Sequence, residues 1–273
     1  MEKTLGELIR NEAPLVMGII NCTPDSFYER SRSEAVEDAL NTARMMIREG
    51  AHILDIGGES SRPGSAYVAA EEELKRVVPV IEAIRKESDI LISVDTRKAP
   101  VARAAVKAGA DIINDISALA DDPELGSFAA EKNLPVILMH MRGTPETMQD
   151  NPFYDDVVAT VKSELLDAAD RAIAAGIKRE NIILDPGIGF GKRQKDNLDL
   201  LKGIKELKKA GYPLLIGLSR KRFIGNITGR EAAGRMAGTL AANLYSAMEG
   251  AEILRVHDVP ETVDTLKMIK ALL

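Results

Sequence analysis

Residues 90–114, ILISVDTRKAPVARAAVKAGADIIN, contain the pattern that decides the fold of this chain. A short apolar run from Ile90 to Val94 is followed by a longer helical stretch, then by Gly109 and a second apolar run from Asp111 to Asn114. Glycine just after a helix suits the left-handed conformation in which many helices end. A strand, a helix and another strand in this order predict a βαβ unit with parallel strands.

The same unit recurs along the whole chain, which predicts eight strands. We expect them at Leu15 to Ile20, His52 to Ile56, Ile90 to Val94, Asp111 to Asn114, Val136 to Met139, Ile182 to Leu184, Leu214 to Gly217 and Glu252 to Arg255. Amphipathic helices are expected between them, for example over Ser33 to Glu49, Ala70 to Lys86 and Asn197 to Lys209. Eight such units can close into a barrel or lie open as a doubly wound sheet. Their even spacing favours an α/β fold of the (β/α)8 TIM-barrel class, with one domain over residues 1–273.

Composition limits the possible partners of the protein. A net charge of -6 and a pI near 5.3 argue against binding to nucleic acid or to an anionic membrane. The single cysteine, Cys22, excludes an intrachain disulfide and a thiolate metal site. No apolar run approaches the roughly 20 residues that a membrane-spanning helix needs. We therefore expect a cytoplasmic protein that acts on small molecules.

Polar residues follow the predicted strands at their carboxyl ends, which in a barrel surround one mouth where active sites lie. These residues are Asn21, Asp55, Asp95, Asn114, Asp115, His140, Asp185, Ser219 to Lys221, Arg255 and His257. A buried strand has no packing reason to end on a charge, so convergence on a ligand explains the pattern. Asp95, Asn114 and Asp185 supply donors and acceptors suited to a flat heterocycle. Asp55 and Asp115 fit a helix-capping role equally well, and His140 fits a structural role better than that of a catalytic base.

Loops and late cations indicate an anion site. Residues 21–27 and 57–65 are rich in glycine, proline and hydroxyl groups, as in plain turns or movable lids, and Arg62 favours anion binding in the second loop. Residues 185–192 contain three glycines and a lysine but lack the spacing of a P-loop. Cations follow the last two strands, where barrels often bind phosphate: Arg220, Lys221, Arg222, Arg255 and His257. The alternative is a solvated run of charges.

Taken together, these segments resemble the dihydropteroate synthase family along nearly the whole chain. The matching segments are Asn21 to Phe27, Gly57 to Gly64, Asp95-Thr96, Asn114-Asp115, Met139-His140, Asp185 to Lys192, Ser219 to Lys221 and Arg255 to His257. The resemblance implies a transferase of folate biosynthesis, a sulfonamide target, that joins dihydropterin pyrophosphate to p-aminobenzoate and releases pyrophosphate before the amine attacks. It also implies a Mg²⁺ cofactor and a homodimer.

The resemblance further implies a role for each site residue. Those implied to be catalytic are Asp95, Asp185, Lys221, Arg255 and His257. Those implied to bind the pterin are Asp95, Asn114, Met139, Asp185, Gly217, Lys221 and Arg255, the last by stacking. Those implied to bind pyrophosphate are Asn21, Ser61, Arg62, Arg255 and His257, with Asn21 also on Mg²⁺. Those implied to bind p-aminobenzoate are Phe27, Ser61, Pro63, Phe190, Lys221 and Arg222.

Departures from the family pattern leave two other functions open. The first loop contains Tyr28-Glu29-Arg30 where the family commonly has serine, aspartate and glycine, and Arg222 stands where a small hydroxyl residue is frequent. One alternative is a methyltetrahydrofolate-dependent corrinoid methyltransferase, which uses a similar barrel. The segments Ser60 to Gly64 and Ser219 to Lys221 argue against it. The other alternative, a non-catalytic pterin-binding subunit, predicts pterin binding without pyrophosphate release.

Overall fold

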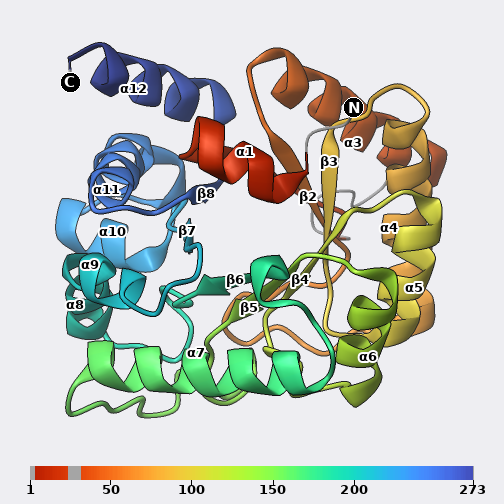
Figure 1. Cartoon of the computed structure of the whole chain (residues 1–273). Coiled ribbons are helices and arrows are strands. Elements are labelled where there is room, and N and C mark those ends of the chain that lie inside the picture. The colour runs from red at the N-terminus through yellow and green to blue at the C-terminus, as the bar shows by residue number, and fades with distance from the viewer. Residues whose placement is uncertain (1–3, 24–31, 273) are drawn as a thin grey trace.

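Eight parallel strands form one sheet that closes into a barrel (Figure 1). The computed structural model describes residues 4–23 and 32–272. The strands are β1 (Leu15–Asn21), β2 (Ile53–Gly57), β3 (Leu91–Asp95), β4 (Ile112–Asp115), β5 (Val136–Met139), β6 (Ile182–Asp185), β7 (Leu215–Gly217) and β8 (Ile253–Val256). Their order in the sheet is β6-β5-β4-β3-β2-β1-β8-β7. A parallel bridge between Leu184 and Leu214 joins the two ends of this order, so the predicted barrel is confirmed over the open sheet.

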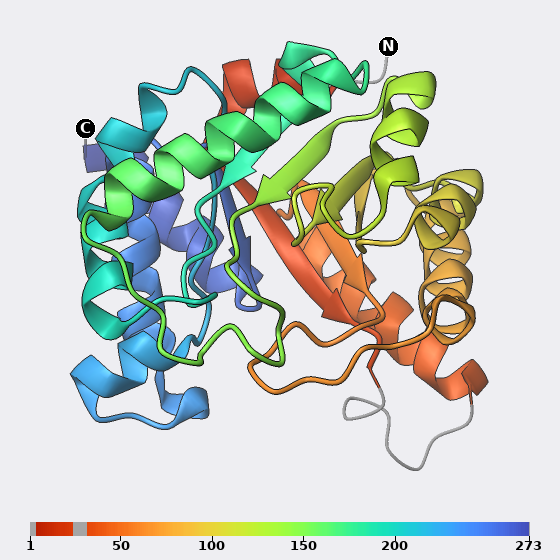
Figure 2. The ribbon, with the colours of Figure 1, turned by 90° about the horizontal axis from the view of Figure 1, so that it is seen from below.

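Helices pack around the barrel. They are α1 (Leu5–Glu12), α3 (Arg32–Arg48), α4 (Ala70–Arg85), α5 (Ala99–Ala108), α6 (Pro123–Lys132), α7 (Val157–Ala174), α8 (Gln194–Lys202), α9 (Ile204–Lys208), α10 (Arg222–Thr228), α11 (Met236–Met248) and α12 (Val259–Leu272). Helix α1 lies across one end of the barrel, and the long loops lie at the other end (Figure 2). None of the helices described here has both the length and the apolar character that crossing a membrane requires.

The predicted strands differ from the observed ones by at most one residue at either end. One predicted helix, over Asn197 to Lys209, is wrong, because the segment forms two helices that meet at Gly203. Gly203 has φ -89° and ψ 6°, outside helical geometry. A Cβ atom at this position would lie 2.7 Å from Cγ2 of Val158 in α7. The close approach of α7 therefore breaks the helix at a residue without a side chain.

The barrel interior is divided into an apolar layer and a polar layer. The apolar layer is a cluster in which Leu5 of α1 packs against Leu15, Met17, Ile53, Ile112, Ile137, Ile183, Leu215 and Ile253. Side chains two residues apart on a strand point to the same side. Two residues further along, the interior therefore receives Asp55, Asn114, Met139, Asp185, Gly217 and Arg255. Helix α1 closes the apolar end, and the polar end is left for a ligand.

Candidate active site

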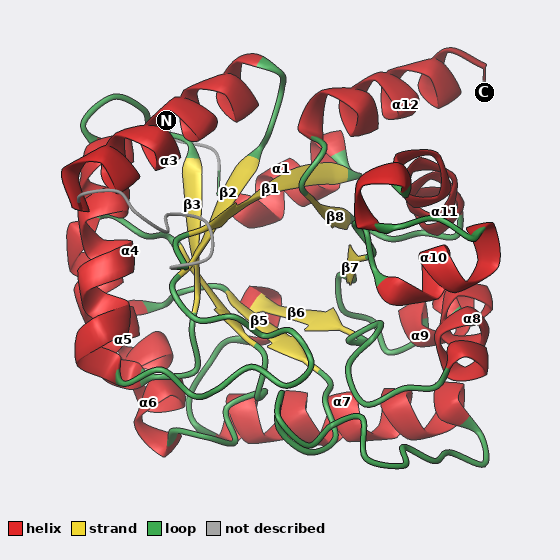
Figure 3. Cartoon of the chain, turned by 180° about the vertical axis from the view of Figure 1, so that it is seen from behind, coloured by secondary structure: helices red, strands yellow, loops and turns green. Residues whose placement is uncertain are grey.

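Strand register places the predicted polar residues at one rim of the barrel. Gly57 of β2 is aligned with Asp95 of β3, and Asp95 with Asn114 of β4. Met139 is aligned with Asp185, and Gly217 with Arg255, on the opposite part of the ring. Figure 3 looks onto this end, where the loops after the strands gather over the barrel. Residues far apart in the sequence thus lie side by side at the mouth.

Arg255 lies at the centre of the polar layer, between two carboxylates. Its Nε donates to Oδ2 of Asp55 at 2.6 Å, and its Nη2 donates to Oδ2 of Asp95 at 2.7 Å. Asn114 donates from Nδ2 to the same Asp55 oxygen at 3.2 Å. Burial raises the pKa of Asp95 to about 7, although Arg255 acts in the opposite direction. These contacts fix the plane of the guanidinium and leave Asp95 able to accept or donate near neutral pH.

Asp55 and Asp115, which the sequence could not separate, have different roles. Asp115 accepts hydrogen bonds at Oδ1 from the N–H and the hydroxyl of Ser117, both at 2.7 Å, and at Oδ2 from Leu119 N–H. It therefore supports the backbone of the loop after β4. Asp55 is fully buried and contacts Arg255 and Asn114 instead. The sequence left Asp55 open between a helix-capping role and a role in the site, and its contacts with Arg255 and Asn114 place it in the polar layer.

Asp185 and Lys221 lie next to the loop after β6, close enough for each charge to act on the pKa of the other group. Asp185 accepts at Oδ1 from Gly187 N–H at 2.7 Å, and burial raises its pKa against the effect of Lys221. Lys221 donates to the carbonyl oxygen of Ile188, and its Nζ lies 4.6 Å from the centroid of the Phe190 ring. Burial lowers the pKa of Lys221 to about 8, with Asp185 acting in the opposite direction. The lysine stem and the aromatic ring thus share one side of the mouth.

His140 and Lys192 connect the loops after β5 and β6. Nε2 of His140 lies 2.6 Å from Oε2 of Glu164, and Nδ1 lies 2.9 Å from Nζ of Lys192. Lys192 also donates to the carbonyl oxygen of Phe190 at 2.9 Å. Burial lowers the pKa of His140 to about 4 and that of Lys192 to about 7. These contacts agree with the structural role that we expect for His140.

The predicted cationic cluster does not converge as a whole. The guanidinium of Arg220 is paired with Asp258, although its charge still helps to lower the pKa of His257. Arg222 is exposed at the start of α10. His257 lies 2.9 Å from the hydroxyl of Ser219, through Nδ1. Burial, followed by the charge of Arg255, lowers the pKa of His257 to about 4.

Ser61, Arg62 and Pro63 lie in the loop after β2, over the mouth. Arg62 and Pro63 are exposed, and Gly64 N–H donates to the carbonyl oxygen of Pro145 in the loop after β5 at 2.9 Å. Asn21 ends β1 in register with Gly57. Phe27, together with the departures at Tyr28-Glu29-Arg30, lies outside the described residues.

A buried ionic network, missed from the sequence, holds the base of the loop after β2. Glu59 accepts from Lys98 at 2.7 Å and from Arg97 at 3.1 Å. Lys98 also donates to Glu73 at 2.5 Å, and Arg97 donates to Asp121 at 2.6 Å. Arg97 and Lys98, the partners of Glu59, follow β3, so the sequence around Glu59 does not predict these contacts. This network fixes the start of the segment that contains Ser61 to Pro63.

Oxygen ligands at the mouth suit a cation that also binds substrate phosphate. Within residues 4–23 and 32–272, no three His, Cys, Asp or Glu side chains come together in a way that could hold a metal. Mg²⁺ commonly binds one or two protein oxygens together with substrate phosphates and water. The amide oxygen of Asn21 at the end of β1 fits that limited contribution.

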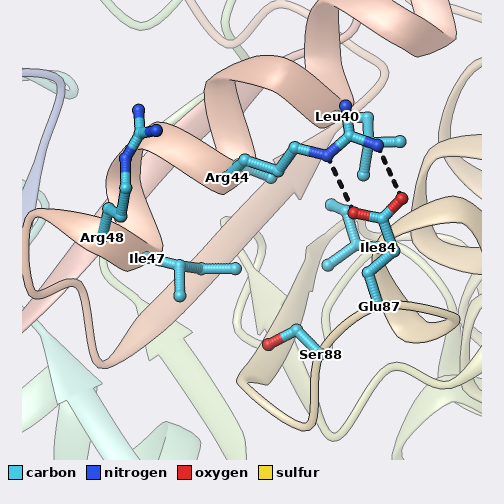
Figure 4. Close-up of a pocket in the computed structure, with 8 residues that line it drawn as sticks. Leu40, Arg44, Ile47, Arg48, Ile84, Glu87 and Ser88 are labelled. Carbon is cyan, nitrogen blue, oxygen red and sulfur yellow. Dashed lines mark hydrogen bonds and ion pairs between the residues drawn. The ribbon is translucent and has the colours of Figure 1, made fainter.

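A cavity of about 280 Å³ lies between α3 and α4, away from the strand ends (Figure 4). It is lined by Leu40, Ile47 and Ile84, with a double hydrogen bond between Arg44 and Glu87 at its edge. Apolar side chains and an already satisfied ion pair offer little to a polar heterocycle. The mouth of the barrel therefore remains the candidate active site.

Comparisons with known proteins agree with this site. The model of the family described as "Pterin binding enzyme" matches residues 17–257. A dihydropteroate synthase of Escherichia coli K12 is 48% identical over 260 residues, which are 95% of this chain and 92% of the relative. A Yersinia pestis dihydropteroate synthase solved with a sulfonamide drug has a TM-score of 0.90 at 44% identity, covering 95% of this chain and 94% of that one. A Xanthomonas albilineans dihydropteroate synthase solved with 7,8-dihydropteroate has a TM-score of 0.87 at 46% identity, covering 96% and 94%.

The chain belongs to the pterin-binding enzyme family, a class of barrel enzymes whose matched segment here includes the whole mouth. Within that family it groups with the dihydropteroate synthases, which are transferases acting on a pterin with p-aminobenzoate. The resemblance seen in the sequence is thereby confirmed, and the corrinoid methyltransferase alternative is not supported by these relatives.

Substitution of Gly187 tests how closely the backbones of the loops after β5 and β6 are packed at the mouth. Its φ is +63°, and a Cβ atom would lie 1.9 Å from the carbonyl oxygen of His140. Gly64 also has a positive φ, +81°, but a Cβ there would meet nothing within 4 Å. We expect Gly64→Ala to cost about 1–2 kcal/mol of unfolding free energy from backbone strain alone. Gly187→Ala should cost about 1–3 kcal/mol more from overpacking. Equal losses in urea unfolding would contradict this difference.

Proposed function

We propose that this chain joins 6-hydroxymethyl-7,8-dihydropterin pyrophosphate to p-aminobenzoate, giving 7,8-dihydropteroate and pyrophosphate. The observation that carries the proposal is the polar layer, in which Asp95, Asn114 and Asp185 surround Arg255 above an apolar floor. Carboxylates and amides at this depth complement the donors and acceptors on the edge of a flat pterin. The relative solved with 7,8-dihydropteroate supports the same product here.

In this proposal the pterin lies in the polar layer. Arg255, held in one plane by Asp55 and Asp95, stacks on the ring, since a guanidinium packs well on a flat π-system. Lys221 and Asp185 contact the ring edge. Met139 and Gly217 line the walls, and a Cβ atom at Gly217 would lie 3.8 Å from Cβ of Arg255. The glycine thus leaves room beside the guanidinium.

The pyrophosphate lies nearer to the solvent, among the loops after β1, β2 and β8. We assign its contacts to Asn21, Ser61, Arg62, Arg255 and His257. Arg62 is close enough to His257 for its charge to contribute to the lowered pKa of that histidine. Mg²⁺, held by Asn21 and by the substrate, would supply positive charge for the departing oxygens. Arg62 and Arg255 add cationic donors that stabilise the same charge.

For p-aminobenzoate we assign a slot beside the pterin, made by Phe190, Pro63, Ser61 and the stem of Lys221. A Cβ atom at Gly189 would lie 3.2 Å from Cδ of Lys221, so the glycine lets the stem lie flat against the loop after β6. Arg222 is exposed at the start of α10, and we assign to it the pairing with the carboxylate of p-aminobenzoate. Phe27, which lies outside the described residues, is assigned to the same slot through the family resemblance.

The chemistry follows from charge. The C–O bond to the pterin methylene breaks first, and its electron pair leaves with pyrophosphate. The resulting cation is delocalised over the dihydropterin ring, where the carboxylates of Asp95 and Asp185 stabilise it. The amine nitrogen of p-aminobenzoate then forms the C–N bond, and its surplus proton passes to the released pyrophosphate. Lys221, Arg255 and His257 hold the reacting groups in place, and the loops exclude water that would trap the cation.

The direct test is incubation with dihydropterin pyrophosphate, p-aminobenzoate and Mg²⁺, followed by chromatography for dihydropteroate and an assay for pyrophosphate. We expect both products in equal amounts. Pterin binding without either product would indicate a non-catalytic pterin-binding subunit. Methyl transfer from methyltetrahydrofolate to a corrinoid would indicate the methyltransferase alternative.

Lys221→Met should weaken binding of dihydropterin pyrophosphate by about 1.5–3 kcal/mol, because a charged donor is lost from a buried contact. Burial lowers the pKa of Lys221 to about 8, so the affinity of the unmodified enzyme should fall as pH rises through that value. The variant should lose the part of this dependence that comes from Lys221. Titration calorimetry from pH 7 to 9 measures both effects, and exposed Lys202→Met serves as the control. Unchanged affinity in Lys221→Met would remove the residue from the site.

We also propose a homodimer that forms through α11. The buried side chains of this helix are polar, namely Thr239, Asn243 and Ser246. Its exposed face is apolar and consists of Ala237, Ala241, Tyr245 and Met248. A helix with its apolar face outward needs a covering surface, and the homodimer implied by the family resemblance would supply one.

We propose the cytoplasm as the compartment of this protein. The single cysteine, Cys22, is buried and free, and a free thiol suits a reducing compartment.

Charged residues on the exposed face of α11 should separate the subunits. We expect the unmodified protein to sediment as a dimer of 29.6 kDa chains and Tyr245→Glu/Met248→Glu to sediment as a monomer. Met45→Glu changes an equally exposed residue, 42% for Met45 and for Tyr245, on α3, and should remain dimeric. A double variant that stays dimeric would exclude this face as the interface.

A further inference from the structure

The hydroxyl of Ser219 makes two contacts with one histidine at the mouth. Ser219 follows β7, and His257 follows β8. Oγ of Ser219 accepts from the backbone N–H of His257 at 3.2 Å and lies 2.9 Å from its Nδ1. Ser219 is 8% exposed. The residue is thus largely buried, and its hydroxyl lies against His257 through both of these contacts.

The turn that contains Ser219 is fixed independently of His257. Its neighbour Arg220 has a φ of 57°, and its guanidinium pairs with Asp258. The backbone N–H of Arg220 donates to Oγ1 of Thr239 at 3.1 Å. Contacts with α11 and with the residue before α12 therefore place the hydroxyl, and the histidine ring meets a group that is already in position.

The hydrogen bonds of the Ser219 hydroxyl determine which tautomer of His257 is favoured. A backbone N–H can only donate, so it uses one lone pair of the Ser219 oxygen. The Ser219 oxygen and Nδ1 of His257 lie 2.9 Å apart, and the tautomer of the ring decides which of them donates. When the hydroxyl donates to Nδ1, its proton has a partner in the protein. A proton on Nδ1 would leave the buried hydroxyl proton without this partner, at a cost in free energy. Because burial and the charge of Arg255 lower the pKa of His257 to about 4, the ring is neutral at pH 7 and its one proton lies on Nε2.

We propose that Ser219 is a positioning residue that holds His257 as a neutral Nε2–H donor for an oxygen of the departing diphosphate. This inference rests on the proposed function, in which His257 contacts that group. A neutral donor stabilises charge developing on the oxygen and adds no further cation beside Arg255 and Arg62. The tautomer is set before the substrate binds, so little reorganisation is needed during the reaction.

Nitrogen-15 NMR of the free enzyme tests the tautomer directly. The chain has three histidines, so His52→Gln and His140→Gln variants assign all the ring signals. His52 is an internal reference, because Val16 N–H donates to its Nδ1 at 3.1 Å and leaves the proton on Nε2. At pH 7 we expect His257 to match His52, with an unprotonated Nδ1 and a protonated Nε2. A protonated Nδ1 in His257 would overturn the proposal and leave the proposed reaction standing.

Three variants then test whether the tautomer of His257 affects binding. Circular dichroism and the melting temperature of each variant are compared with those of the unmodified protein, to show that it is folded. Ser219→Ala should give a mixture of tautomers and weaken the binding of inorganic pyrophosphate in the presence of Mg²⁺ by roughly three- to tenfold. Ser219→Thr keeps a hydroxyl and should restore both properties. Ser246→Ala removes a hydroxyl that donates within α11, to the carbonyl oxygen of Ala242, so the His257 tautomer should persist.

Two outcomes of these variants would overturn the proposal. In one, Ser219→Ala leaves the His257 signals unchanged. In the other, the signals change but pyrophosphate affinity does not, so the donor role is lost. Failure of the proposed function is a separate result, since it appears as absent dihydropteroate in the unmodified enzyme.

Discussion

The site depends on one buried interaction, the pairing of Arg255 with Asp55 and Asp95 inside the barrel. Charges are costly in a protein interior unless partners of opposite sign compensate them. Here three strands each contribute one member, and Asn114 adds a hydrogen bond to Asp55. Removing either carboxylate would leave a guanidinium only partly compensated. The polar layer is therefore stable as a set, and this explains how a barrel core can keep so many ionisable groups at one end.

That set also determines the electrostatics of the mouth. Burial raises the pKa of the carboxyl groups of Asp95 and Asp185 and lowers that of Lys221. Each of these groups is thus moved toward neutral pH, where a proton is gained or lost at little cost. The chain as a whole has a charge of -6, so the attraction for a diphosphate has to be local. In the function proposed above, Arg255 and Arg62 of the loop after β2 would supply it.

The strands and most residues of the candidate site could be predicted from the sequence, because a strand and the residue that ends it are local features of the chain. The two-residue period of the strands already places Asn114, Asp185 and Arg255 on one interior face. The positions of the late cations could not be predicted in the same way. Arg220 and Lys221 are adjacent, yet one pairs with Asp258 and the other lies beside Phe190. Which way each side chain points depends on partners far along the chain.

The sequence by itself determined the order of the βαβ units, the residues at the strand ends and the family to which the chain belongs. Tertiary structure alone decided that Asp55 supports Arg255 while Asp115 supports a loop, and that Glu59 and Lys192 fix the segments around the mouth. It also broke one predicted helix at Gly203, where α7 approaches. The physical reason is common to all of these cases. Backbone periodicity is set by near neighbours, whereas the partner of a buried charge or hydroxyl is set by whichever strand or loop the closed ring brings beside it.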